Sequence, residues 1–110
     1  MLVAIASSQG RVSPVFDVAG RLTTVRLKGS EELSRAEVAL CHGPPADIAR
    51  HLTELGTSVL ICGAISEQLE SAVSRRGIRI IPRVCGEIDE VLRAFETGRL
   101  KKRSVPIRPV

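Results

Sequence analysis

Two cysteines that each follow a short apolar run are the residues of this sequence best suited to chemistry. Cys62 directly follows residues 59–61, and Cys85 comes four residues after the run 78–81; a glycine follows each cysteine. Parallel strands joined by a helix end at the same edge of a sheet, and neighbouring strands lie roughly 4.8 Å apart. We therefore expect Cys62 and Cys85 to lie side by side at the edge where open α/β sheets bind their ligands.

Paired thiolates at such an edge could bind a soft metal or one side of an iron–sulfur cluster, or could form a disulfide. Cys85 also precedes a predicted helix, whose free backbone N–H groups would polarise its thiol. The alternative is that both are small buried residues beside tight glycine turns, because free cysteine is common in cores. Two thiolates are too few for a closed site, so further ligands would come from another protein, a second copy or His42.

Four polar side chains are candidates for completing this site. His42 follows a predicted strand that ends at the same edge, although two strands would separate it from Cys62. Ser7, Ser8 and Ser13 belong to a loop expected to hang over the edge, where hydroxyl groups could donate hydrogen bonds to cluster sulfides. The alternatives are a solvated loop histidine and a turn whose serines satisfy its own backbone.

The elements that would position these residues follow from the hydrophobic pattern. Apolar runs and alternation predict five strands, at residues 2–6, 20–28, 36–40, 58–61 and 79–82. Three helices are predicted within residues 44–56, 66–77 and 88–98, each ending at a glycine. Helices that alternate with strands after an antiparallel meander predict a three-layer α/β/α domain.

The distribution of charge predicts one domain in residues 1–98 and a basic, mobile tail in residues 99–110. The chain has 110 residues and a net charge of +4, but five of its 16 bases and none of its 12 acids lie in the last twelve residues. The remaining 11 bases and 12 acids leave the domain nearly neutral. Three cysteines, no signal peptide and no apolar run of ~20 residues predict a reduced, cytoplasmic protein without membrane contact.

The sequence lacks the residues that several functions require. Metal-dependent hydrolysis requires clustered carboxylates that hold a divalent metal, and the first predicted strand, residues 2–6, contains none. No glycine-rich or P-loop motif for nucleotides is present. The chain has no Trp or Tyr, so stacking on nucleic acid bases is not expected and nucleic acid is not an expected partner. We assign no catalytic residues.

Four segments occur in a recognisable order up to Leu100: residues 13–16, LGTSVLICGAIS, RRGIRIIP and CGEIDEVLRAFETGRL. Their order and spacing resemble the dinitrogenase iron–molybdenum cofactor-binding family, which includes NifX and the C-terminal domain of NifB. The resemblance implies a ribonuclease-H-like fold with a mixed five-stranded sheet of order 3-2-1-4-5, in which strand 2 is antiparallel. Typical members have Phe-Gly-Arg near the position of Phe16, whereas here Asp17 follows Phe16 and the Gly-Arg pair is displaced to Gly20-Arg21.

The resemblance further implies that the protein binds an iron–sulfur or iron–molybdenum cluster precursor rather than turning over a substrate. We therefore expect a non-catalytic carrier or accessory protein of metallocluster assembly, related to nitrogen fixation, with Cys62 and Cys85 as ligands. Its expected partners are metallocluster donor and acceptor proteins or a second copy of the chain. Two alternatives are a thiol–disulfide redox protein that uses the same cysteines and a cofactor-free protein-interaction module.

Overall fold

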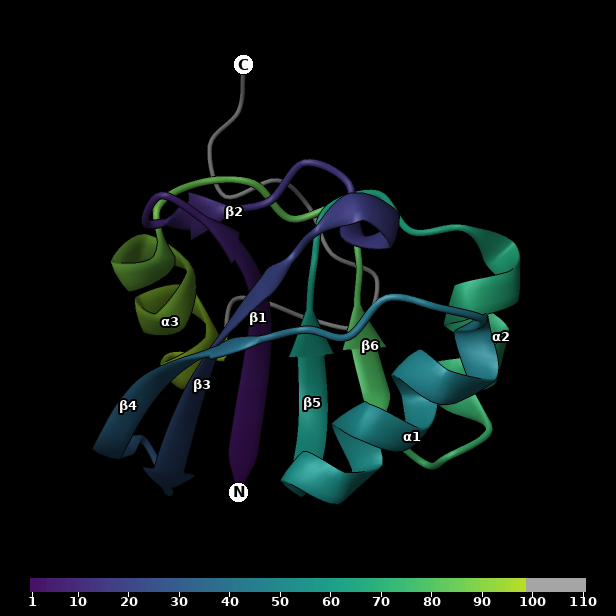
Figure 1. Cartoon of the computed structure of the whole chain (residues 1–110). Helices are drawn as coiled ribbons and strands as arrows, with labels where there is room; N and C mark the ends of the chain where they lie inside the picture. The colour runs from purple at the N-terminus through teal and green to yellow at the C-terminus, as the bar shows by residue number, and fades with distance from the viewer. Residues whose placement is uncertain (99–110) are drawn as a thin grey trace.

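A mixed β-sheet forms the middle layer of the computed structural model, which describes residues 1–98 (Figure 1). The predicted mobile tail, residues 99–110, lies outside the described residues. The strands are β1 (Leu2–Ser8), β2 (Arg11–Val12), β3 (Arg21–Lys28), β4 (Glu31–Ala39), β5 (Thr57–Ile61) and β6 (Arg79–Ile81). Five of them lie in the order β4-β3-β1-β5-β6, and the two-residue strand β2 pairs with the end of β1.

The direction of the strands matches the expected topology. β1, β5 and β6 are parallel, whereas β3 is antiparallel to both β1 and β4. Numbered as the five predicted strands, the order is 3-2-1-4-5 with strand 2 antiparallel. This part of the prediction is confirmed, while the short strand β2 was not predicted.

Helices cover both faces of the sheet, with α3 on one side and α1 and α2 on the other (Figure 1). They are α1 (Pro45–Leu55), α2 (Glu67–Ser74) and α3 (Ile88–Glu96), with a short 3-10 helix, η1 (Phe16–Val18), at the end of the first loop. The predicted cap of α2 is present, since the Ser66 hydroxyl accepts a hydrogen bond from the Leu69 N–H at 3.3 Å. Among residues 1–98, no helix combines the length and hydrophobicity needed to cross a bilayer.

Two aliphatic layers join the helices to the sheet. Leu22 and Leu60 contribute to the layer under α1 and α2, whereas Ile5 and Ile61 contribute to the layer under α3. Because successive residues of a strand face opposite sides, a strand that serves both layers is apolar throughout. The three-layer α/β/α architecture is confirmed.

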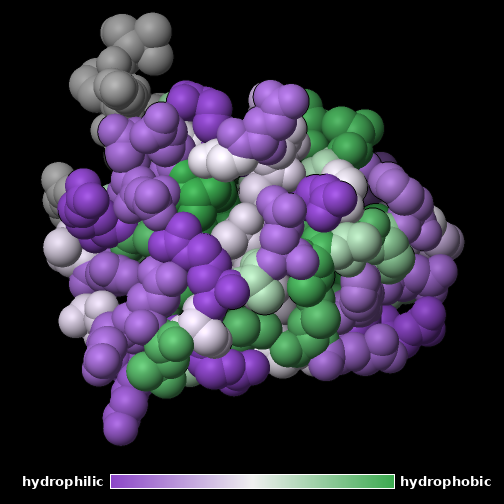
Figure 2. Space-filling view, turned by 60° about the vertical axis from the view of Figure 1, so that its left-hand side comes forward, coloured by the Kyte–Doolittle hydropathy of each residue, from purple (hydrophilic) through white to green (hydrophobic). Residues whose placement is uncertain are grey.

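The outer strand β4 is longer and more polar than predicted. Residues 31–37 are exposed, and the strand begins well before the predicted start of the segment 36–40. Arg35 binds Glu32 at 2.9 Å and Asp89 of α3 at 2.8 Å, which ties the edge to the helix layer. Figure 2 shows the side of the molecule that carries β4, where hydrophilic residues dominate and hydrophobic ones form smaller groups between them. Charged residues on an edge strand discourage pairing with another sheet.

Thr57, the first residue of β5, carries a buried hydroxyl that has no hydrogen-bond partner among the described residues. Such a group has lost its bonds to water without replacement. Replacing Thr57 with isosteric valine is therefore expected to raise the free energy of unfolding by about 1 kcal/mol in urea denaturation. Thr23→Val is the control, because the Thr23 hydroxyl donates to the Ser7 hydroxyl at 3.0 Å and its loss should destabilise. Destabilisation by both substitutions would contradict this account of Thr57.

Candidate functional site at the ends of β5 and β6

The backbone segments that carry the two cysteines lie together beyond the ends of β5 and β6. The Cys62 N–H donates to the Ile81 carbonyl at 3.1 Å, and the Cys62 carbonyl accepts from the Val84 N–H at 3.0 Å. Cys85 follows this bonded pair directly. The crossover of the chain through α2 thus brings the two segments to one edge, as the topology predicts.

The two side chains, however, lie in different environments. Cys62 is 0% exposed within the hydrophobic layer under α1 and α2, whereas Cys85 is exposed, and both are free thiols. Leu60 faces the same layer, and residues two apart on a strand share a face, so Cys62 continues this inward row. Burial of Cys62 matches the alternative of a small core residue, whereas exposure of Cys85 does not. A ligand role for either thiol stays a prediction.

The surroundings of Cys62 also disfavour its thiolate. Burial is the main cause that raises the pKa of the Cys62 thiol to about 12; the negative charges of Glu70 and Asp17 act in the same direction, and Arg83 acts against them. The thiolate is the form that binds metals and attacks disulfides. With its thiol buried, Cys62 is therefore protonated at neutral pH and acts as a packing residue.

A loop segment closes over the turn that follows Cys62. The Ala64 N–H donates to the Pro14 carbonyl at 2.8 Å, and the Phe16 N–H donates to the Ala64 carbonyl at 2.7 Å. A Cβ atom at Gly63 would lie 2.4 Å from the same Pro14 oxygen, so this close approach requires glycine. Phe16 is buried beneath the closure.

The first part of the same loop contacts the segment that follows Cys85. The Val12 N–H donates to the Gly86 carbonyl at 2.9 Å, and the Ile88 N–H donates to the Gly10 carbonyl at 3.0 Å. The segment of residues 7–16, which includes the end of β1 and all of β2, therefore lies over both strand ends, in the position that the sequence predicts.

The three candidate serines lie in different surroundings. Ser7 is buried, and its hydroxyl oxygen accepts the hydrogen bond from Thr23. Ser13 is also buried and donates to the Val15 carbonyl at 3.4 Å. Ser8 is exposed. Ser7 and Ser8 belong to β1 rather than to the expected loop, and only Ser13 bonds within the loop itself. Hydrogen bonding of the three hydroxyl groups to cluster sulfides stays a prediction.

His42 lies apart from the two predicted ligands. It is exposed and, with Cys41 and His51, lines a hollow of about 310 Å³ beside α1 that includes neither Cys62 nor Cys85. His51 Nδ1 accepts a hydrogen bond from the Cys41 N–H at 3.3 Å. Within residues 1–98, no three His, Cys, Asp or Glu side chains are placed to hold one metal ion. A ligand role for His42 stays a prediction.

Arg83, two residues before Cys85 in the chain, has a left-handed conformation with φ 61°. This conformation is rare for residues other than glycine. Its N–H donates to the Gly63 carbonyl at 2.9 Å, which joins the two turns. No glycine marks this position, so the turn leaves no signal in the sequence.

Comparison with known proteins places this chain in a family. A family model described as "Dinitrogenase iron-molybdenum cofactor" matches residues 1–98, the whole described part of the chain. The chain belongs to this family. The predicted family membership is thereby confirmed for the dinitrogenase iron–molybdenum cofactor family.

Solved structures show how closely this member of the dinitrogenase iron–molybdenum cofactor family keeps the shared fold. The crystal structure of PH0822 is similar with a TM-score of 0.84 and 25% identity, over 92% of this chain and 95% of the other. A candidate dinitrogenase from Methanocaldococcus jannaschii gives a TM-score of 0.74 at 22% identity, over 92% of each chain. A candidate NifB protein from Thermotoga gives 0.71 at 21% identity, over 91% of this chain and 90% of the other. No protein with a curated description matches.

Proposed function

We propose that this family member is a non-catalytic carrier or accessory protein that holds an iron–sulfur or iron–molybdenum cluster precursor as its cargo. Two observations support the proposal. The family model spans residues 1–98, and Cys85 offers an exposed thiol at the edge where the fold gathers its loops. Thiolates are the usual protein ligands of cluster iron.

In the proposed role, Cys85 supplies one ligand and the donor or acceptor protein, or a second copy of the chain, supplies the others. Cys62 is buried and protonated in the closed arrangement, so it supports the turn rather than the cargo. A cargo held by one thiolate of the carrier is easily passed to a partner that offers more ligands. This incomplete ligand set is the reason to expect transfer rather than permanent binding.

Anaerobic reconstitution of the full chain with iron and sulfide tests this function. We expect visible charge-transfer absorbance in the wild type and its loss in Cys85→Ser. Cys41→Ser is the matched control, because the half-buried Cys41 lies in the separate hollow beside α1 and its loss should leave the absorbance unchanged. Unchanged colour in Cys85→Ser would rule out the proposal, and a colourless wild type would rule out a second copy of the chain as the source of the other ligands.

The alternative of a cofactor-free interaction module is favoured by the burial of Cys62 and by the lack of a three-residue metal site within residues 1–98. It predicts a folded protein that stays colourless after reconstitution, as do its Cys85→Ser and Cys41→Ser variants. The thiol–disulfide alternative predicts instead a two-proton mass decrease that maps to Cys62 and Cys85, which requires the Cys62 thiol to leave the core.

A further inference from the structure

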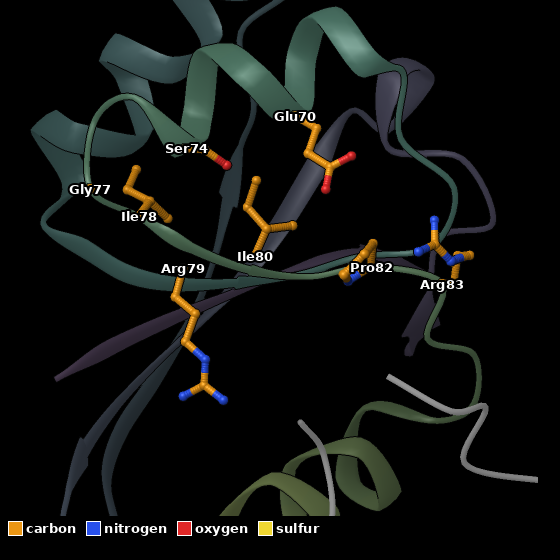
Figure 3. A pocket seen from close by; sticks show the side chains of 8 residues that line it. All are labelled: Glu70, Ser74, Gly77, Ile78, Arg79, Ile80, Pro82 and Arg83. Atoms are coloured by element: carbon orange, nitrogen blue, oxygen red, sulfur yellow. The ribbon is translucent and has the colours of Figure 1, made fainter. Parts of the chain in front are cut away.

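A groove runs between α2 and β6. β6 is the edge strand at the opposite end of the sheet from β4. The groove has a volume of about 720 Å³. Figure 3 shows Ile78 and Ile80 pointing from the strand toward α2, with Glu70 and Ser74 on the facing side of the helix. The groove therefore has an apolar floor and a polar wall.

Within residues 1–98, the outer edge of β6 lies beside this groove without a partner strand. The Ile81 carbonyl accepts from Cys62 on the inner side, and successive residues of a strand turn their backbone groups to opposite sides. The N–H and carbonyl of Ile80 therefore face outward, where an added strand could bond to them.

The same edge concentrates positive charge. Residues 71–86 contain four arginines and no acid: Arg75, Arg76, Arg79 and Arg83. All four are exposed, and none forms an ion pair within residues 1–98. Elsewhere in the described chain, Arg35 is held by two carboxylates. Arg79 and Arg83, which line the groove, thus form no ion pair with the described residues, although Glu70 lines the same groove; Arg75 lines a separate hollow between α1 and α2.

Two of these arginines line the groove and approach it from different positions. Arg79 points away from Ile78 and Ile80, whereas Arg83 lies beyond the strand with its guanidinium on the α2 side (Figure 3). In a strand added to β6, alternate side chains would face the apolar floor and the opposite side, next to Arg79. A segment that alternates apolar and acidic residues fits both requirements.

We propose that the open edge of β6 is a docking site for an acidic, extended segment of a partner protein, which adds to the sheet as a further strand. Main-chain hydrogen bonds to Ile80 would provide affinity, and carboxylates near Arg79 and Arg83 would select acidic partners. Nucleic acid fits less well, because both Phe16 and Phe95 belong to the packed layers and the chain has no Trp or Tyr for stacking on bases. The proposal does not depend on cluster binding.

Fluorescence anisotropy with the full-length protein tests this site. The probe is a labelled eight-residue peptide of alternating glutamate and valine, and a 12-nucleotide oligodeoxythymidine serves as the nucleic acid probe. We expect the peptide to bind wild type, and the double substitution R79E/R83E to weaken binding at least ~10-fold. The amide of Ile80 should also exchange more slowly when peptide is bound, while that of Leu60 should not change.

Two further variants separate the groove from general surface charge. Glu70→Gln removes the acid of the groove wall and should tighten peptide binding ~2-fold to ~3-fold. Arg26→Glu reverses an exposed base on β3, outside the groove, and should change the affinity less than ~2-fold. Residues 99–110 are present in every variant, so they contribute equally. Absence of peptide binding, equal loss in Arg26→Glu, or tighter binding of the oligonucleotide would overturn the proposal.

Discussion

Replacing Gly63 with alanine is expected to lower the free energy of unfolding by about 3 kcal/mol. The added Cβ would lie 2.4 Å from the Pro14 carbonyl oxygen and 2.6 Å from that of Ser13. Both obstacles are backbone atoms, and the Pro14 oxygen already accepts the hydrogen bond from Ala64. The chain cannot relieve the clash by rotating a side chain, so the loop must move away from the turn. Urea denaturation measures the loss.

The same substitution should open the cover over Cys62. A thiol reagent applied to the folded protein should modify Cys62 faster in Gly63→Ala than in wild type, while the rate at the exposed Cys85 stays the same. Gly20→Ala is the matched control, because nothing lies within 4 Å of a Cβ at Gly20 and its φ is not in the left-handed region. It should change stability by less than ~1 kcal/mol. Equal effects of the two substitutions would show that the contact with Pro14 is unimportant.

The position of Cys62 shows how far the sequence reaches and where it stops. The apolar run 59–61, the cap at Ser66 and the run 78–81 predict two parallel strands joined by a helix, and that geometry is confirmed. The apolar run alone does not show that the Cys62 side chain packs under α1 and α2. The alternation of side chains along a strand does indicate it, because residues 60 and 62 share one face. Cys85 lies past the end of β6, where no strand period applies.

Local polarity explains the other differences between expectation and structure. β4 begins at Glu31 because an edge strand with exposed faces needs no apolar alternation, so its polar first half looked like a loop. β2 has only two residues and follows a two-residue turn in which Gln9 has φ 52° and Gly10 has φ 80°; Gly10 marks the turn, but two residues are too few to show a strand pattern. The groove beside β6 depends on the spacing between α2 and the strand, a tertiary property that no local pattern encodes.

The buried thiol of Cys62 should make the protein lose stability in alkaline solution. Its pKa is about 12 in the folded state, against an ordinary value of 9.0. Above pH 9 the unfolded chain therefore releases this proton while the folded chain retains it, so unfolding becomes more favourable as the pH rises. The stabilising contribution is complete below pH 9 and is lost between pH 9 and 12, by about 1.4 kcal/mol per pH unit. The chain contains no tyrosine, so few other side chains titrate in this range.

Urea denaturation of the full chain at pH 8 and pH 11 would measure this loss. The wild type should be less stable at pH 11 by about 2.5 kcal/mol. Cys62→Ala should start from a lower stability at pH 8, because it leaves a small cavity, but should lose much less on going to pH 11. Cys85→Ala removes an exposed thiol and should keep the full dependence of the wild type. If Cys62→Ala and the wild type decline in parallel, another group causes the decline. Cys62 would then ionise without difficulty in the folded protein, and the argument that it cannot serve as a ligand in the closed arrangement would fail.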